Sequence, residues 1–441
     1  MDSLTSASAS ELAAAIRARE VSSTEAIDAH LARIEAVNPR LNAVVQLDAE
    51  GARATARARD EALARGETPG PLHGVPFTVK DWIETEGLVC AAGQKERALL
   101  IPKRDATAVA RLRAAGGVLL GKTLDGVDGA RNAVYGVCHN PYDLARTPGE
   151  SSSGEAAIVA AGGSPLGLAS DSGGSIRYPA HCCGVAALKP SAGRVPLTGH
   201  FPRIDWLNDP RTQIGPIARR VEDIALALAV IGGPDGRDAS VAPVPLEDWT
   251  AVDLPRLRVA MFTAFGRASP DASTVEAVRS AARALADAGA EVEETLPPRL
   301  DDVWDITLVH WARVRSYSWR EWRAEKESSL TADEIERSLF AWGRLQREML
   351  AFMARYDAVL IPAAPSAAAV RADNPGPGPF VYTLPWSLTG YPVAVVRAGT
   401  SSDRMPVGVQ LVAGPWRDDV ALAAAAQVER ALGGWQAPEL R

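Results

Sequence analysis

Lysine is scarce in this chain of 441 residues. Of its 47 basic residues only six are lysine, so arginine supplies nearly all of the positive charge. Blocks of one charge sign are also absent, and the formal net charge is −7. Nucleic acids and anionic membranes attract clustered positive charge, so neither is expected as a partner.

Long hydrophobic runs are missing as well. The longest, AAIVAAGGSPLGLA at 156–169, is broken by glycine and proline and is too short to cross a bilayer. The first twenty residues lack a basic stretch followed by an apolar one, so no signal peptide is expected. These absences favour a soluble, cytoplasmic protein.

The chain has only four cysteines, Cys90, Cys138, Cys182 and Cys183, and no two of them form a CxxC pair. Four cysteines in a chain of this size, two of them adjacent, suit reduced thiols better than a disulfide framework. The sequences CHN (138–140) and HCC (181–183) lack the spacing of zinc ligands. We therefore expect no metal and no cofactor. A thiol nucleophile at Cys182 or Cys183 is a weaker alternative, since cysteine in a run of small residues is usually core.

Two signatures of serine enzymes do not occur. There is no GxSxG pentapeptide, and no lysine has a serine three positions before it. What is present is SDSGGSIRYPAHCCG at 170–184, where Ser175 follows two glycines and His181 is the nearest imidazole. A serine needs a base to act as a nucleophile, and from these residues alone a triad built on a histidine stays open.

Several segments indicate an α/β protein. Ser22 stands three residues before Glu25, which is capping-box spacing, and the apolar period that follows predicts a helix ending at Asn38-Pro39. From Leu72 to Thr123 the pattern is strand, helix, strand. No repeat and no long linker is visible, although the length alone allows two domains.

Lys80 ends the apolar run GVPFTVK, where a charge is costly unless it is paired or lost. Burial lowers the pKa of a lysine, and a neutral amine can act as a general base, which arginine cannot do. The simpler interpretation is that Lys80 pairs with Asp81 or Glu84 at the end of a strand.

The motifs together resemble the amidase signature family. They are GVPFTVKD (74–81), GKT (121–123), the run of about fifty residues from 146 to 196 that includes GESSSG and SDSGGS, GPIARRVEDIA (215–225) and MPVGVQLVAG (405–414). Their order and spacing match. The resemblance implies one large α/β domain over 1–441, with a mixed, mostly parallel central sheet covered by helices on both faces. Its family-like core spans about 60–230 plus 350–430, and a helical cap region covers about 250–350.

By position, the family's Ser-Ser-Lys triad falls on Ser175 as nucleophile, Ser151 as bridging serine with a cis peptide bond, and Lys80 as base. His181 then becomes a structural or pocket-wall residue. The glycines of SDSGGS let successive N–H groups turn toward one point, so we expect an oxyanion hole from the amides of Ser172, Gly173, Gly174 and Ser175. The structural alternative for this loop is a glycine turn between a strand and a helix.

The chain departs from the family pattern in two places. The family usually has two glycines on each side of the paired serines, whereas here Gly149-Glu150 precede them and Ser153-Gly154 follow. After GKT the sequence continues LDGVDGA instead of Asn and an acidic residue followed by Phe. The first change affects the loop around Ser151, and the second affects the expected substrate entrance.

The resemblance implies an amidohydrolase that forms an acyl-enzyme and cleaves carboxylic amides, with carbamates and esters as further candidate substrates. A glutamine-hydrolysing subunit of a tRNA-dependent amidotransferase is the alternative within the family. A non-catalytic binding protein on the same fold is the alternative outside it. The expected partner is a small amide or carbamate, and a homodimer stays open.

Aromatic side chains indicate an apolar substrate pocket. We expect Phe201, Trp206, Tyr382 and Trp386 to line it, together with part of a stripe formed by Trp304, Trp311 and Trp322. The simpler interpretation is that these rings pack the cap region onto the core.

Overall fold

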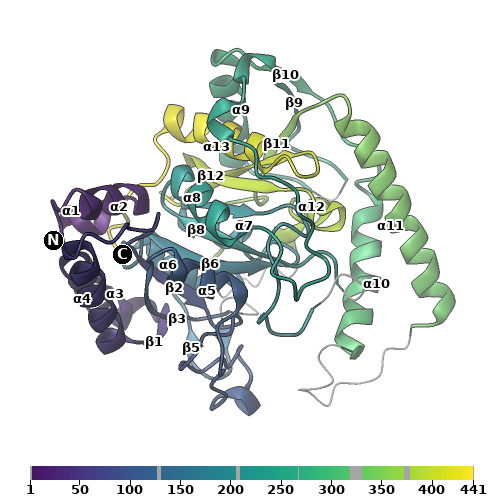
Figure 1. Cartoon of the computed structure of the whole chain (residues 1–441). Coiled ribbons are helices and arrows are strands. Elements are labelled where there is room, and N and C mark those ends of the chain that lie inside the picture. Colours follow the sequence, from purple (N-terminus) through teal and green to yellow (C-terminus); the bar gives the residue numbers. More distant parts are fainter. Residues whose placement is uncertain are drawn as a thin grey trace.

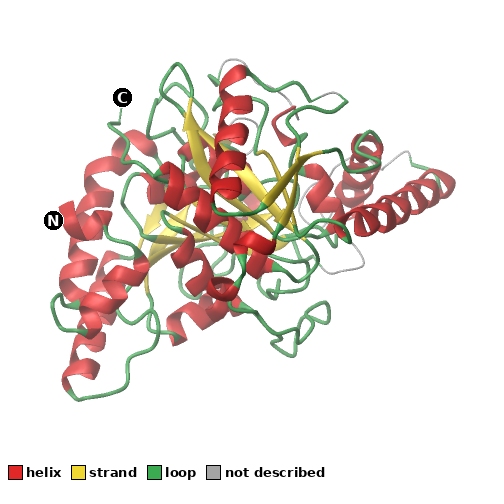
Figure 2. Ribbon diagram, turned by 90° about the horizontal axis from the view of Figure 1, so that it is seen from above, coloured by secondary structure: helices red, strands yellow, loops and turns green. Residues whose placement is uncertain are grey.

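The computed structural model describes residues 2–126, 131–204, 209–266, 268–317, 330–371 and 378–440. Its centre is one twisted sheet (Figures 1 and 2). In spatial order the strands are β1 (Val44–Leu47), β3 (Val118–Thr123), β2 (Pro76–Lys80), β6 (Leu166–Asp171), β8 (Gln213–Ala218), β7 (Ala186–Lys189), β12 (Val393–Thr400), β13 (Pro406–Ala413), β11 (Ala358–Pro362), β9 (Arg258–Met261) and β10 (Glu291–Glu294). A small separate ladder joins β4 (Arg131–Asn132) to β5 (Gly136–Val137).

The sheet is mixed, as expected, but it is not mostly parallel. Neighbours are parallel at β2–β3, β2–β6, β9–β10 and β9–β11, and antiparallel at the other six boundaries. Parallel strands need a long crossover, which a helix supplies between β2 and β3, whereas β12 and β13 are joined directly as a hairpin. The strand–helix–strand pattern in the sequence is therefore a local feature and does not extend to the whole sheet.

Helices surround the sheet (Figure 2). They are α1 (Asp2–Ser6), α2 (Ala9–Arg17), α3 (Ser23–Leu41), α4 (Ala49–Ala64), α5 (Thr107–Ala114), α6 (Ser153–Ala160), α7 (Arg177–Cys183), α8 (Val221–Ile231), α9 (Ala272–Asp287), α10 (Asp302–Tyr317), α11 (Ala332–Met353), α12 (Leu384–Thr389) and α13 (Asp418–Leu432), with short 3-10 turns at Lys95–Arg97, Trp249–Ala251, Leu254–Arg256 and Gly378–Phe380. No helix in these described stretches is long and apolar enough to cross a membrane.

The predicted helix at the N-terminal end is α3. Its N-cap is Ser22, whose side chain accepts from the Glu25 amide while the Glu25 carboxylate accepts from the Ser22 amide, so the capping box is confirmed. The helix ends at Leu41, past the expected stop at Asn38-Pro39, and Asn42 closes it in a left-handed conformation. Proline has no N–H to donate, but the following residues can still complete the last turn.

The helix α6 passes through the interior. All eight of its residues are buried, including Glu155. A Cβ atom on Gly154 would lie 2.5 Å from the Ala43 carbonyl oxygen, so a side chain there would displace the helix. This close packing fixes the start of α6, which begins two residues after Ser151.

The expected helical cap region is only partly helical: its first part contributes β9 and β10 to the central sheet, and its second part forms α10 and α11, which lie side by side at one edge of the molecule (Figure 1). The inner face of this pair belongs to a second apolar core that includes Val303, Ile306 and Trp342. Trp342 Nε1 donates to the Leu388 carbonyl at 2.6 Å, which ties α11 to α12. The cap region is therefore packed against the segment that follows it in the chain.

Candidate active site

Parallel neighbours β2 and β6 bring the predicted base to the centre of the sheet. Phe77 pairs with Leu166 and Val79 with Leu168, so the carboxyl ends of the two strands lie together. Lys80 ends β2, and Ser170 stands next to last in β6. In α/β sheets the carboxyl ends of parallel strands are where sites form, and this edge carries most of the predicted residues.

The Lys80 side chain is fully buried. Its Nζ lies 2.7 Å from Ser151 Oγ, 3.2 Å from Ser170 Oγ and 3.3 Å from the Ser170 carbonyl oxygen. It forms no ion pair with any residue of the described chain, so the simpler expectation that it pairs with Asp81 or Glu84 is wrong. The amine also lies 4.6 Å from the centre of the Trp82 ring.

Burial lowers the pKa of Lys80 to about 7, against the opposing effect of the negative charges of Asp125, Asp171 and Glu155. Burial and the charge of Asp81 raise the pKa of Asp125 to about 7. Asp125 accepts from Trp82 Nε1 at 2.5 Å, so the ring beside the amine is tied to this carboxyl. The interior thus holds an amine that loses its proton near neutral pH.

Ser151 lies one residue before the N-cap of α6 and is 8% exposed. We expected a cis peptide bond at Ser151, and this is wrong: the one cis bond among the described residues is Phe201–Pro202. Ser151 reaches Lys80 with a trans backbone, which is the lower-energy form for a non-proline residue.

The departures around Ser151 are accommodated without glycine. The Ser153 amide donates to the Glu150 carbonyl at 2.8 Å, and Ser153 begins α6. Gly149, which the chain keeps, has φ +111, and a Cβ there would lie 2.5 Å from Pro179 Cα. The position that needs a glycine is thus occupied by one, and those at 150 and 153 allow side chains.

Ser175 lies in the loop between β6 and α7 and is partly exposed. Gly174 before it has φ +144, a conformation that favours glycine, and a Cβ there would lie 2.5 Å from Thr383 Oγ1. Within the described chain, Ser175 Oγ makes no hydrogen bond, so the structure joins Lys80 to Ser151 but not Ser151 to Ser175. The predicted triad is therefore partly assembled.

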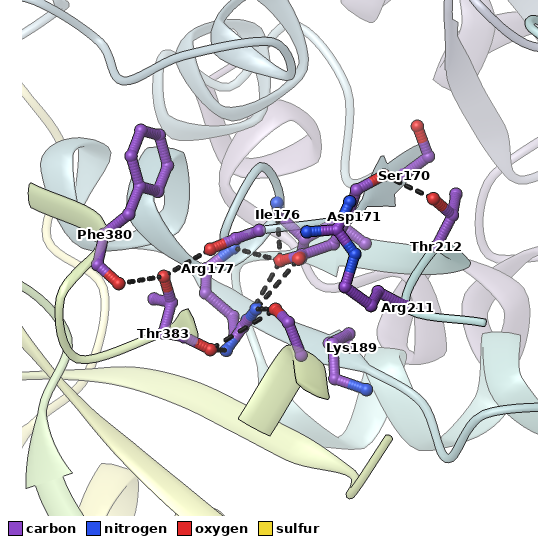
Figure 3. Close-up of polar contacts among 12 residues, drawn as sticks. Ser170, Asp171, Ile176, Arg177, Lys189, Arg211, Thr212, Phe380 and Thr383 are labelled. Carbon is purple, nitrogen blue, oxygen red and sulfur yellow. Dashed lines mark hydrogen bonds and ion pairs between the residues drawn. The ribbon is translucent and has the colours of Figure 1, made fainter. Parts of the chain in front are cut away.

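An ion pair that the sequence analysis did not single out supports this loop (Figure 3). Asp171 accepts from the Ile176 amide at 3.0 Å and from Arg177 Nη2 at 2.9 Å, and both charged side chains are fully buried. Burial alone would raise the pKa of Asp171, but Arg177 and the amides hold it below its usual value. Arg177 Nη1 also donates to the Thr383 carbonyl at 2.7 Å, which connects the loop to α12.

Replacing Asp171 by asparagine should destabilise the fold by about 3–5 kcal/mol, because the Arg177 charge would stay buried without its partner. Urea unfolding at pH 7 measures this. The matched control is Asp28→Asn in the half-exposed Asp28–Arg53 pair, which should cost less than about 1 kcal/mol. Equal losses in the two variants would contradict the assigned role of the buried pair.

Four successive amides of the loop have no acceptor among the described residues: those of Ser172, Gly173, Gly174 and Ser175. The next amide, Ile176, already donates to Asp171. The expected oxyanion hole coincides with these four free donors. On the other side of the loop, the Gly173 carbonyl accepts from Thr383 Oγ1.

A polar chain connects the loop to the cap region. Ser172 Oγ contacts Thr212 Oγ1, and Thr212 donates to the Asp209 carboxylate at 3.1 Å. Asp209 also accepts from Arg211 Nε at 2.9 Å, and His310 Nε2 of α10 lies 3.3 Å away. Burial lowers the pKa of His310 to about 4, so near neutral pH this histidine is uncharged.

His181 is part of the packing. Its Nδ1 accepts from the Gly408 amide at 2.9 Å, and its Nε2 lies 3.0 Å from the Ser366 carbonyl oxygen. Both nitrogens are therefore used, and they hold α7 against β13. Burial raises the pKa of the Cys182 and Cys183 thiols well above the ordinary value, which disfavours a thiolate. No group of metal-ligating side chains occurs in the described ranges.

A cavity of about 600 Å³ lies beside the loop, between α10 and the residues before α12. Its apolar wall includes Phe265, Leu300, Val303, Trp304, Val381 and Leu384, and Asp301 and Asp305 stand on its side. Leu384 links the cavity to the loop, since a Cβ on Gly173 would lie 3.6 Å from Leu384 Cδ2 and 3.5 Å from Trp311 Cζ2. Of the tryptophan stripe, Trp304 thus lines the cavity and Trp311 lies beside Gly173 of the loop.

The other expected pocket residues are placed differently. Phe201 is 4% exposed under Arg97, and Tyr382 and Trp386 are fully buried. None of the three lines the cavity, so their contact with substrate stays a prediction that the cavity does not support. Trp206 and Trp322 lie outside the described residues.

Sequence reasoning missed Ser170, His200 and Thr383. Ser170 precedes the aspartate of the SDSGGS motif, so its position in the motif was visible. His200 and Thr383 come from distant loops, and no local pattern around either marks it. Their contacts with the site were found only in the structure.

The family model described as Amidase matches residues 25–344 and 312–422. The chain is 35% identical over 481 residues to a subunit of glutamyl-tRNA(Gln) amidotransferase from Anaeromyxobacter sp. (strain K), with 97% of this chain and 96% of the relative covered. It is 33% identical over 465 residues to an acylamidase from Rhodococcus erythropolis, with 96% and 94% covered. The chain therefore belongs to the amidase (amidase signature) family.

Comparison with solved structures agrees with this family assignment. The structure of 6-aminohexanoate cyclic dimer hydrolase complexed with substrate matches with a TM-score of 0.86 and 28% identity, covering 99% of each chain. The expected family and the mixed central sheet with helices around it are thus confirmed, and the protein is an amidohydrolase of this class. The relatives include both an acylamidase and a component of an amidotransferase, so the substrate is a separate question.

Proposed function

We propose that this protein hydrolyses amides of apolar or aryl acyl groups through an acyl-enzyme on Ser175, with Ser151 as bridging serine and Lys80 as base. One observation carries the proposal: a fully buried lysine without an ion pair in the described chain, 2.7 Å from the hydroxyl of Ser151. A neutral amine in that position is a general base, and near pH 7 this lysine can be neutral.

In the proposed reaction, Ser175 attacks the substrate carbonyl while its proton passes to Ser151 and the Ser151 proton passes to Lys80. The tetrahedral oxyanion lies against the four free amides of residues 172–175. The proton on Lys80 returns through Ser151 to the leaving nitrogen. A water molecule then attacks the acyl-enzyme with the same base, which releases the acid and regenerates Ser175.

The hydrogen bond from Ser175 to Ser151 has to form when substrate binds, because the structure without substrate lacks it. Catalytic hydrogen bonds are often long or poorly aligned without substrate and shorten in the reacting complex. Rotation about one side-chain bond of Ser175 changes the direction of its Oγ, and its partial exposure leaves room for that rotation.

The cavity supports an apolar substrate. Its wall is mostly aliphatic and aromatic, and its volume suits a small organic molecule. A carbamate fits the same chemistry, because its carbonyl can use the same amides and loss of the alcohol leaves a carbamoyl-enzyme. We therefore extend the proposal to aryl carbamates and to esters.

An anilide should be cleaved with much higher kcat/KM than acetamide or glutamine, and Trp304→Ala should reduce that preference about 10-fold or more, since the ring lines the cavity. The measurement is kcat/KM for the three substrates in the parent and the variant. The control is Trp249→Ala, which removes a half-buried tryptophan from the other core and should leave the ratio unchanged. Equal turnover of all three substrates would contradict the apolar pocket.

Glutamine hydrolysis within a tRNA-dependent amidotransferase is the second candidate, because a relative of that class is 35% identical. Free glutamine carries a carboxylate, which calls for a cation at the site. The described residues lining the cavity include no arginine or lysine that could pair with this carboxylate, which disfavours this candidate. Glutaminase activity of the single chain above its anilide activity would favour it, and complete inactivity on every substrate would favour the non-catalytic alternative.

A further inference from the structure

Lys80 has three polar neighbours, and they can be assigned as donors and acceptors. A neutral amine has two N–H donors and one lone pair. The Ser170 carbonyl oxygen, 3.3 Å from Nζ, can only accept. The remaining N–H and the lone pair are divided between two hydroxyls, those of Ser170 at 3.2 Å and Ser151 at 2.7 Å.

Which hydroxyl donates its proton to the lone pair decides whether Lys80 can act as a base. If Ser170 donates its O–H to the amine, the lone pair is occupied by a residue that takes no part in the proposed reaction. If Ser170 accepts instead, both N–H groups point to Ser170, and the lone pair points to Ser151. Only the second arrangement can remove the proton from Ser151.

His200 selects between these arrangements. It is buried, and its Nε2 lies 2.9 Å from Ser170 Oγ. Its Nδ1 lies 3.2 Å from the Pro202 carbonyl oxygen, which can only accept, so Nδ1 carries the proton and Nε2 is an acceptor. Burial, together with the charge of Lys80, lowers the pKa of His200 to about 4, and the neutral form is present near pH 7.

The position of His200 is fixed from several sides. Its ring meets the Trp82 ring edge to face at a centre distance of 6.0 Å. The Phe201 amide donates to the Trp82 carbonyl at 2.8 Å, and the Glu84 amide donates to the Gly199 carbonyl at 2.8 Å. The segment around His200 is therefore joined to the segment that follows Lys80, although the two are far apart in the sequence.

Resting on the proposed function, we propose that His200 is a positioning residue: it holds the hydroxyl proton of Ser170 and thereby directs the lone pair of Lys80 to Ser151. The two ring nitrogens of His200 contact Pro202 and Ser170, so the histidine acts on the amine through the Ser170 hydroxyl. The role goes beyond the triad, because it assigns the direction of the base and not its identity.

The first test is His200→Phe, which keeps an aromatic ring against Trp82 but has no acceptor for Ser170. We expect kcat for an anilide to fall about 10- to 100-fold with KM unchanged, because part of the general-base contribution is lost. The acidic limb of the pH–kcat/KM profile should move to lower pH, because without His200 the Ser170 hydroxyl proton has an acceptor only when the amine is neutral, which favours the neutral form. A purely structural role would not move this limb.

Rescue and control variants sharpen the test. His200→Gln can present Oε1 to Ser170 and should restore most of kcat and the parent limb. The control is His30→Phe, which removes another buried histidine on α3 and should leave the limb in place. Equal loss in His200→Phe and His200→Gln, or an unchanged limb in His200→Phe, would overturn the proposal.

A double-mutant cycle with Ser170→Ala gives an independent arm. Without the Ser170 hydroxyl nothing competes for the lone pair, so His200→Phe should have no further effect on kcat in that background. If His200→Phe does not fold, His200→Leu takes its place in the cycle. Effects that multiply would overturn the proposal. Failure of the proposed function would be seen separately, because the single variant Ser175→Ala would then keep its activity.

Discussion

Ser175→Ala should lower anilide hydrolysis by a factor on the order of 10⁴ to 10⁶, because the covalent step runs through the oxygen that is removed. The loop should keep its shape, since Ser175 Oγ makes no hydrogen bond to any described residue and the neighbouring Asp171–Arg177 pair is untouched. Circular dichroism and urea unfolding check that the fold is retained. The activity measurement then reports on chemistry alone.

Covalent labelling tests the same oxygen directly. An aryl sulfonyl fluoride or a phosphonate should modify the parent on Ser175, and mass spectrometry of the peptide digest locates the adduct. Ser175→Ala should not be labelled, whereas Ser273→Ala, at the start of α9, should be labelled as the parent is. An adduct on Ser151, with Ser175→Ala still active, would show that the nucleophile is misassigned.

The sequence was sufficient where the evidence is local or where a long motif is matched. The capping box of α3 involves residues three apart, and it formed as expected. The family and the mixed α/β sheet followed from motifs whose order and spacing extend over most of the chain. Lys80 and Ser151 were placed by the same motifs, and their side chains meet.

The sequence was insufficient where contacts join distant segments. Thr383 contacts the Gly173 carbonyl, and His200 contacts Ser170, yet neither residue carries a local signature. The sequence was also insufficient to predict which aromatic residues line the pocket. Hydrophobicity does not tell a core position from a pocket wall, so Tyr382 and Trp386 were expected at the pocket and are buried, whereas Trp304 does line the cavity.

Lys80→Met should lower kcat by about 10² to 10⁴, the usual contribution of a general base, while the protein still folds. The methionine side chain is similar in length to lysine but carries no charge. The substitution therefore removes the amine, whose protonation is costly in this interior. Because the folded-state pKa is lowered, the unfolded chain binds an extra proton between about pH 7 and the ordinary lysine pKa, and Lys80 destabilises the native state as the pH falls through that range. Urea unfolding at pH 7 should therefore show Lys80→Met to be at least as stable as the parent.

The pH profile of the parent should carry the signature of this amine. The base must be neutral, so kcat/KM should rise with pH through about 7 and then level off, and chelators should not change it. The limb belongs to Lys80 and Asp125 together, since they titrate in the same range.

Asp125→Asn removes a negative charge that stabilises the protonated amine, so the limb should move to lower pH. Glu429→Gln is the control. Burial also raises the pKa of the Glu429 carboxyl to about 7, but this carboxyl accepts a hydrogen bond from the Val221 amide at the start of α8. It is not among the charges that act on Lys80, so its replacement should leave the limb in place. An unmoved limb in Asp125→Asn, or His181→Ala as damaging as Lys80→Met, would mean that a different group supplies the base.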